Sequence, residues 1–214
     1  MADSVYDNTI TFHPTGEIKP LAYIKNTIDL GSPKFILTTN NFGLIATIND
    51  PNGNKRLFTL NENAIHTFSG TTNDGTLIIH NLLQKLAKQS VFQGVIEYEN
   101  IYDEISLASA KRTISQSRLI SAVSSTVYRK KNEEGKYEFH MLECDPFGEV
   151  YEYVLNATGH RSASVLSVME KEDLQDRSVE DVLLRVKECF RSVFSTDLVD
   201  AIVLDKDGIK EFTV

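Results

Sequence analysis

The chain has 214 residues, of which 41% are hydrophobic, and a formal net charge of −8. This composition is typical of a globular domain with a sizeable core. The acidic excess argues against nucleic-acid binding, because binding to phosphates needs a surplus of Lys and Arg. The two cysteines, Cys144 and Cys189, are too few for a disulfide scaffold and match no metal-binding spacing, so we expect no metal and no cofactor.

Membrane and secretion signals are also missing from the sequence pattern. No apolar run approaches the roughly 20 residues of a membrane span. The stretch MADSVYDN at the start carries no apolar signal core. We therefore expect a soluble, intracellular protein that makes no contact with a membrane.

The first part of the chain predicts a helix followed by two hairpins. The helix covers residues 17–30 and ends at Gly31, a residue favoured after helix C-termini. Asn40-Asn41 separates the first two strands by the two residues of a tight hairpin. The four apolar, β-rich runs are residues 33–39, 42–48, 55–60 and 64–69.

The middle of the chain changes to a helical period. Four residues at positions i, i+3, i+4 and i+7 form one helix face: Ile79, Leu82, Leu83 and Leu86. Residues 72–74 supply possible N-caps, and a second helix is predicted over residues 101–118. Strands then return at residues 120–128, 136–143 and 149–155.

The last part of the chain predicts two helices and a final hairpin. A short helix covers residues 161–169, and a longer one covers residues 178–194 with a clear apolar stripe. Ser178 and Asp181 have the spacing of a capping box. The final strands are residues 199–205 and 209–213. Hairpins imply antiparallel sheets, and paired helices imply layers over them, so we expect an α+β fold arranged as a four-layer αββα sandwich.

The sequence Gly159-His160-Arg161-Ser162 could be interpreted as catalytic. Consecutive helical residues point in different directions, however, and only neighbours three or four apart share a face. We therefore interpret this segment as the first turn of a helix. Gly159 or Ser162 caps it in this interpretation, and Arg161 pairs with an acidic neighbour.

Several short motifs resemble those of proteasome core-particle subunits of the alpha type. They are Tyr6-Asp7-Asn8, residues 11–16, Gly31-Ser32, Ser69-Gly70 and residues 145–148. The opening stretch is most similar to the sixth member of the eukaryotic alpha ring. The sequence departs from the signature at Ala22, which replaces a glutamate, and the segment 6–14 is one residue shorter.

This resemblance implies one domain over residues 1–214, with the N-terminal-nucleophile hydrolase type of sandwich and an extra N-terminal helix. It implies a non-catalytic subunit of a seven-membered ring of alpha subunits, stacked on a ring of beta subunits, in cytoplasm and nucleus. Residues 1–16 would be a gate segment at the entry pore, and the leading helix 17–30 would contact a neighbour. The ring serves ubiquitin-dependent and ubiquitin-independent protein degradation.

The resemblance also implies two sets of functional residues. The open gate of the family is stabilised by residues that match Tyr6, Asp7, Pro14 and Tyr23, although Tyr23 could equally be a packed helix residue. The C-terminal tails of activators would dock at a pocket where Arg56 binds the tail carboxylate. Ser69 and Gly70 would line that pocket. The alternative is that Arg56 is an ordinary exposed charge on a strand.

A second function, threonine-type peptidase activity, follows from the related beta subunits. Their N-terminal threonine is the nucleophile and its own amine is the base. The aspartate and lysine that support it fall here at Ile48 and near Arg56, neither of which can do that chemistry. Processing at Gly70-Thr71 would be needed to expose a threonine. The simpler interpretation is that Thr71 and Thr72 end a strand and begin a helix.

Overall fold

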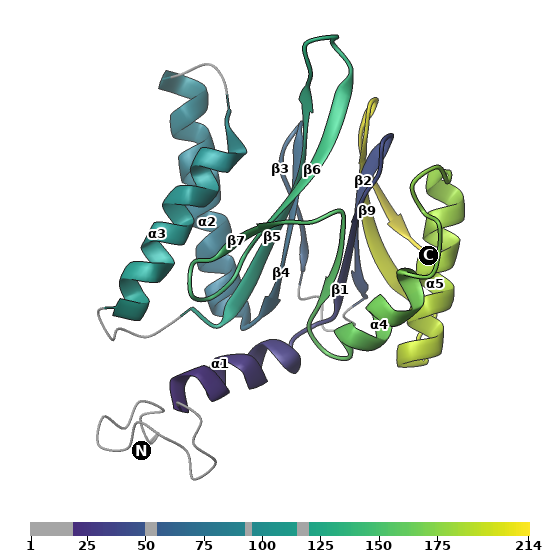
Figure 1. The fold of residues 1–214 in the computed structure, drawn as a ribbon, viewed down its shortest axis with the longest axis horizontal. Helices are drawn as coiled ribbons and strands as arrows, with labels where there is room; N and C mark the ends of the chain where they lie inside the picture. The colour runs from purple at the N-terminus through teal and green to yellow at the C-terminus, as the bar shows by residue number, and fades with distance from the viewer. Residues whose placement is uncertain (1–18, 50–54, 93–95, 115–119) are drawn as a thin grey trace.

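The protein is described here from a computed structural model that covers residues 19–49, 55–92, 96–114 and 120–214. Two five-stranded antiparallel sheets pack face to face. Helices α2 and α3 cover the outer face of one sheet, and α4 and α5 cover the other (Figure 1). The predicted four-layer α+β sandwich is confirmed. Within the described ranges, no helix is long and apolar enough to cross a membrane.

The first sheet has the strand order β10-β9-β2-β1-β8. Its strands are β1 (Lys34–Thr38), β2 (Phe42–Ile48), β8 (Leu155–Thr158), β9 (Val199–Asp205) and β10 (Gly208–Thr213). The expected turn at Asn40-Asn41 is present, because the Thr39 amide donates to the Phe42 carbonyl across it at 2.8 Å. Helices α4 (Ser162–Met169) and α5 (Val179–Phe194) pack on this sheet.

The second sheet has the strand order β3-β4-β5-β6-β7. Its strands are β3 (Leu57–Asn61), β4 (Ala64–Gly70), β5 (Ala122–Lys131), β6 (Tyr137–Cys144) and β7 (Val150–Glu152). Helices α2 (Thr72–Phe92) and α3 (Tyr98–Ile114) cover it. Helix α3 begins three residues earlier than expected, because Tyr98 belongs to the buried cluster beneath it.

The strand expected over residues 149–155 proves to be two strands in different sheets. The Tyr153 amide donates to Met141 in the second sheet, whereas the Val154 carbonyl accepts from the Thr38 amide in the first. Strand β7 is therefore an edge strand of the second sheet, and β8 is an edge strand of the first. An alternating pattern shows only that the backbone is extended, so it could not reveal this crossing.

Helix α5 anchors the core on the outer face of the first sheet. Val182, Val186 and Phe190 are fully buried along one stripe. The Ser178 hydroxyl accepts a hydrogen bond from the Asp181 amide at 3.2 Å, which confirms the predicted N-cap. A separate apolar cluster fills the space between the two sheets: Ile36, Ile45, Ile65, Val127, Met141, Ile202 and Leu204.

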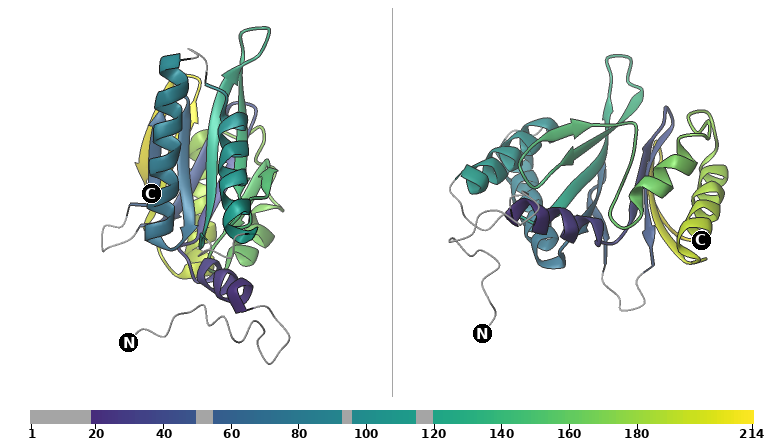
Figure 2. Two further views of the ribbon diagram at one scale, coloured as in Figure 1. Left: turned by 90° about the vertical axis from the view of Figure 1, so that its left-hand side faces the viewer. Right: turned by 60° about the horizontal axis from the view of Figure 1, so that its bottom comes forward.

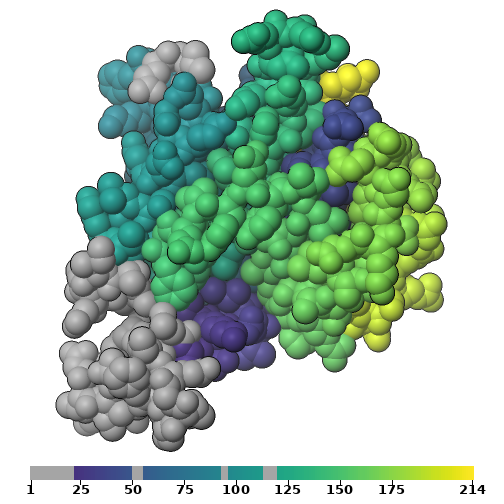
Figure 3. All heavy atoms as spheres, viewed as in Figure 1, coloured from purple at the N-terminus to yellow at the C-terminus, as the bar shows by residue number. Residues whose placement is uncertain are grey.

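Helix α1 (Lys19–Asp29) lies at the base of the sandwich, below the second sheet (Figures 1 and 2). Its residue Ile24 is 1% exposed, and the helix contacts β4 and β5. In the space-filling view α1 (purple) fills the base between the α3 side and the α4 side (Figure 3). The predicted gate segment, residues 1–16, lies outside the described residues.

Candidate functional site

The ends of α1, β4 and β8 and the start of β1 meet at one point, which we call the corner. The Ser69 hydroxyl donates to the Ser32 carbonyl at 3.0 Å, and the His160 amide donates to the Gly31 carbonyl at 2.9 Å. A Cβ atom at Gly159 would lie 2.5 Å from the Ser32 oxygen and 2.7 Å from the Ser69 hydroxyl. The corner is therefore filled by backbone in direct contact around Gly159.

Gly70 closes the same corner from the side of the second sheet. It has a φ of 116°, and a Cβ there would lie 2.2 Å from the Ser121 oxygen. The next amide, that of Thr71, donates to this same oxygen at 2.9 Å. The Gly70–Thr71 bond thus joins the end of β4 to the start of α2 with its backbone held against the neighbouring strand.

Arg56 lies immediately before β3 rather than within it. Its Nη2 donates to the Thr72 hydroxyl at 3.1 Å, and its Nη1 donates to the Gly70 carbonyl at 3.4 Å. The guanidinium carbon lies 4.7 Å from the centre of the Phe68 ring. The structure therefore brings Arg56 and Gly70 together, as predicted, but the Ser69 hydroxyl points into the corner instead. Docking of a peptide tail on these three residues stays a prediction.

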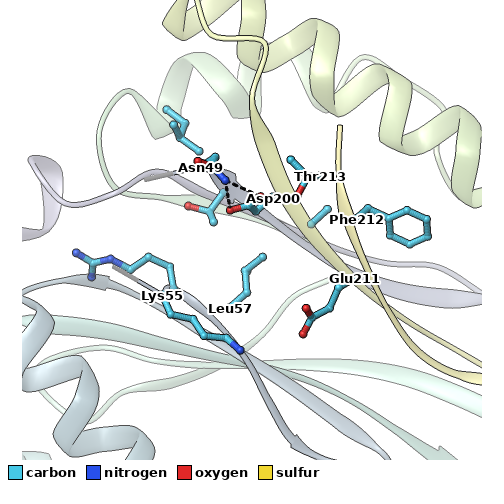
Figure 4. A pocket seen from close by; sticks show the side chains of 11 residues that line it. Asn49, Lys55, Leu57, Asp200, Glu211, Phe212 and Thr213 are labelled. Carbon is cyan, nitrogen blue, oxygen red and sulfur yellow. Dashed lines mark hydrogen bonds between the residues drawn. The ribbon is translucent and has the colours of Figure 1, made fainter. Parts of the chain in front are cut away.

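A groove of about 360 Å³ opens between β3 of one sheet and β10 of the other. Lys55 and Glu211 are exposed and extend into it from opposite walls (Figure 4). Its lining residues are Thr47, Ile48, Asn49, Lys55, Arg56, Leu57, Asp200, Ala201, Glu211, Phe212 and Thr213. Ser69 and Gly70 are not among them.

Asp200 fixes one end of this groove. The Asn49 amide nitrogen donates to both of its carboxylate oxygens, at 3.0 and 2.9 Å, as the dashed lines in Figure 4 show. The Thr213 hydroxyl donates to Oδ1 at 2.9 Å. Asp200 therefore joins β2, β9 and β10 at their common end. Its carboxylate is fixed by these three hydrogen bonds, whereas the side chains of Lys55 and Glu211 have no comparable hydrogen bonds within the described residues.

On the other side of the space between the sheets lies a buried ion-pair network. Lys34, 1% exposed, places Nζ 3.3 Å from Glu143 Oε2. The Ser125 hydroxyl, which accepts from Lys34, donates to the same carboxylate at 2.6 Å, and the Asn156 amide donates to its other oxygen at 2.9 Å. Burial lowers the pKa of the Lys34 amine, and the Glu143 charge and hydrogen bond raise it part of the way back.

Sequence reasoning missed this network. The signal available was a lysine that opens a strand whose next three residues are apolar. A charged residue in such a strand needs a buried partner, but Glu143 lies in the other sheet. Only the stacking of the two sheets reveals the partner. Within the described ranges, no group of His, Cys, Asp or Glu side chains is arranged to hold a metal ion.

The predicted gate residue that the structure describes is Tyr23, on α1. Its side chain is 36% exposed, and its carbonyl accepts from the Thr27 hydroxyl at 2.8 Å. The role of Tyr23 at a gate stays a prediction. The other three predicted gate residues, Tyr6, Asp7 and Pro14, lie outside the described residues.

The prediction for residues 159–162 is partly wrong. The residues form the start of a helix, as expected, but neither Gly159 nor Ser162 is its N-cap. Arg161 takes the N-cap position with a φ of 54°. Its Nη1 donates to the Val193 carbonyl at 2.7 Å rather than to an acidic residue. The reason is that this carbonyl belongs to the last turn of α5, where the helix dipole makes oxygens attractive to a cation.

Comparison with known proteins gives the family to which this sandwich belongs. The family described as "Proteasome subunit" matches residues 38–203. The chain belongs to the proteasome subunit family. It is 25% identical over 199 residues to "Proteasome subunit alpha type-7-1B" of Drosophila melanogaster, which covers 89% of this chain and 78% of that protein. The resemblance to proteasome subunits is confirmed, while the sixth position in the ring stays a prediction.

Proposed function

We propose that this proteasome-family chain is a non-catalytic alpha-type subunit of the 20S core particle. It takes one place in a seven-membered alpha ring and stacks on the ring of beta subunits. The similarity to a protein named as an alpha type subunit supports this assignment, as do the alpha-type motifs and the helix α1 that precedes the sandwich.

The filled corner is the observation that carries this proposal. A threonine peptidase of this fold needs a free N-terminal threonine at the start of a strand, with open space beside it. Here the chain continues from β1 back through Ser32 and Gly31 into α1. The Ser32 carbonyl is bound by Ser69, and the backbone of Gly159 occupies the remaining space. Ile48, at the aspartate position, supplies no acid.

The alternative peptidase, processed at Gly70–Thr71, fits the structure poorly. Cleavage there would separate strands β1 to β4 from the rest of the chain. These strands are not peripheral, because β2 pairs with β9 and β4 pairs with β5. The Thr71 amide, which would become the catalytic amine, already donates to Ser121.

As an alpha subunit the chain would help to form the substrate entry pore and the surface that receives activators, in cytoplasm and nucleus. Tyr23 would join Tyr6, Asp7 and Pro14 in stabilising the open gate. The exposure of Tyr23 supports this role. The groove between β3 and β10 supports activator docking on the same subunit, because it offers a cation beside apolar lining.

Affinity purification of the tagged full chain, followed by crosslinking and mass spectrometry, tests the proposal. We expect proteasome alpha and beta subunits at equal abundance and a peptide that spans an intact Gly70–Thr71 bond. A chain that starts at Thr71 and hydrolyses fluorogenic peptides, with activity lost in Thr71→Ala, would establish the peptidase instead. A chain that co-purifies with no proteasome subunit would refute both.

A further inference from the structure

A second hollow, of about 560 Å³, lies at the base of the molecule between α1 and the turn that joins β6 to β7, and we call it the base groove. Its apolar lining comes from three segments that are distant in the sequence: Ile24, Ile28, Val123, Pro146 and Phe147. Binding pockets of roughly 300–1,000 Å³ are typically lined in this way, with a few polar groups at defined positions. The base groove therefore has the size and the surface of a binding site, and it shares no described lining residue with the groove between β3 and β10.

Both walls of the base groove are fixed by contacts within the chain. In the β6–β7 turn, Asp145 Oδ1 accepts a hydrogen bond from the Phe147 amide at 2.8 Å. A Cβ atom at Gly148 would overlap the Ser106 carbonyl oxygen, so this turn rests directly on α3. On the other wall, the buried side chain of Ile24 anchors α1. A groove whose walls are already fixed loses little binding free energy to ordering when a partner enters it.

The charges at the rim of the base groove favour a cation. Asp29 is exposed at the C-terminal end of α1, and the last turn of this helix carries no basic residue in the part of the chain that the structure describes. The helix dipole adds partial negative charge at the same end. Asp145 supplies a second carboxylate from the opposite wall, and Lys25 opposes the two acids with one positive charge. The rim is therefore acidic above an apolar floor.

We infer that the base groove binds a segment of a partner protein in which a bulky apolar side chain is next to a basic residue. The apolar side chain lies between Ile28 and Phe147, and the basic one reaches Asp29 and Asp145. Apolar burial supplies most of the affinity, while the exposed charges mainly set the selectivity, because ion pairs in water are weak. A second copy of this chain, with a net charge of −8, is repelled by an acidic rim. The inference goes beyond the proposed function, because the groove belongs to the single chain.

The test measures fluorescence anisotropy with the full chain and a peptide, Gly-Ser-Phe-Arg-Ser-Gly, that carries an uncharged label. Both ends of the peptide are blocked, so that the arginine is its only charge. Replacing the phenylalanine with alanine should lower affinity about tenfold or more, because the apolar burial is lost. Replacing the arginine with glutamine should lower affinity about threefold, and replacing it with glutamate about tenfold.

Variants of the chain test the rim directly, and they change exposed side chains that folding does not require. Asp29→Asn should lower affinity for the arginine peptide about threefold and leave affinity for the glutamine peptide unchanged. Lys25→Gln should strengthen binding of the arginine peptide about twofold. Asp176→Asn is the matched control, because it removes an exposed carboxylate from the connection between α4 and α5, outside the base groove. It should leave both affinities unchanged.

Several results overturn the inference. Equal affinity for the phenylalanine and alanine peptides, or for the arginine and glutamate peptides, would do so, as would equal effects of Asp29→Asn and Asp176→Asn. Dimerisation of the chain that excludes the peptide and is weakened by Asp29→Asn would assign the base groove to a second copy. Binding of phenethylammonium as tightly as the arginine peptide would assign it to a small amine, and either result would remove the partner segment.

Discussion

The two sides of the space between the sheets handle charge in opposite ways. On the side of β1 and β8, Lys34 and Glu143 are buried and share hydrogen bonds with Ser125 and Asn156. On the side of β3 and β10, Lys55 and Glu211 extend into an open groove. The same two sheets thus enclose one ion pair and leave another pair of charges in water.

The strand order explains the difference. Strand β1 lies between β2 and β8, and β4 and β6 face it from the second sheet, so a charge there is shut away from solvent. Isolated buried charges cost several kcal/mol, so the network must satisfy Lys34 completely. At the edges β3 and β10 water remains available. A charge at those edges needs no internal partner, which leaves it available for a ligand.

The largest expected effect comes from breaking the enclosed pair. Glu143→Gln leaves the Lys34 charge buried without its counter-ion, and we expect the free energy of unfolding to fall by about 3–5 kcal/mol. Glu211→Gln on the open side should change it by no more than about 0.5 kcal/mol. Urea unfolding of the full chain measures both.

The double variant Lys34→Met/Glu143→Leu sharpens this test. It removes both charges from the apolar surroundings and should recover most of the lost stability, since apolar side chains often replace buried pairs without net cost. Similar losses for Glu143→Gln and Glu211→Gln would show that the two sides do not differ.

The second test compares one glycine from each side of the space between the sheets. Gly159, at the end of β8, and Gly208, in the β9–β10 turn, both have positive φ, at 100° and 136°. Alanine should cost about 1–2 kcal/mol at each from conformation alone. Only at Gly159 does the added Cβ overlap neighbours, so Gly159→Ala should cost about 1–3 kcal/mol more.

Thermal unfolding of the two glycine variants under the same conditions provides the measurement. A smaller loss in Gly159→Ala than in Gly208→Ala would mean that the corner can relax. It would also remove the main structural argument that the corner has no room for a substrate.

The third test uses pH, because the enclosed network affects a histidine on the opposite face of the same sheet. Burial, and next the charge of Lys34, lower the pKa of His66 from 6.5 to about 3. Between these values the unfolded chain binds a proton on this histidine and the folded chain does not. Stability should therefore fall as pH falls through that range, by up to about 1.4 kcal/mol per pH unit from this group.

His66→Gln should remove this part of the pH dependence, whereas the exposed control His80→Gln should not. An unchanged pH profile in His66→Gln would contradict this description.

Local features of this fold could be predicted from the sequence because their causes are local. The Ser178 cap and the apolar stripe of α5 depend on residues within a few positions of one another. The tight turn at Asn40-Asn41 is of the same kind. The motifs on which the resemblance to proteasome subunits rests are also short and continuous.

The remaining features depend on how distant segments stack. The partner of Lys34 lies in another sheet, and the partner of Arg161 is a carbonyl at the end of α5. The division of residues 149–155 between two sheets leaves the local alternation unchanged. Arg56 meets Gly70 and Thr72 while Lys55 extends into the groove, and neighbours in sequence cannot show this.

The last test concerns Asp200, which is hydrogen-bonded like the enclosed pair but lies on the open side. Asp200→Asn keeps the shape and one carbonyl acceptor for the Asn49 amide or the Thr213 hydroxyl. Hydrogen bonds to charged groups contribute about 1.5–3 kcal/mol when no water can replace them. Asp200 is only half-buried, so water can replace part of the lost hydrogen bonding. We therefore expect the free energy of unfolding, measured in urea, to fall by about 1 kcal/mol. A loss as large as that in Glu143→Gln would mean that the groove excludes water, and the two sides would then not differ in the way they handle charge.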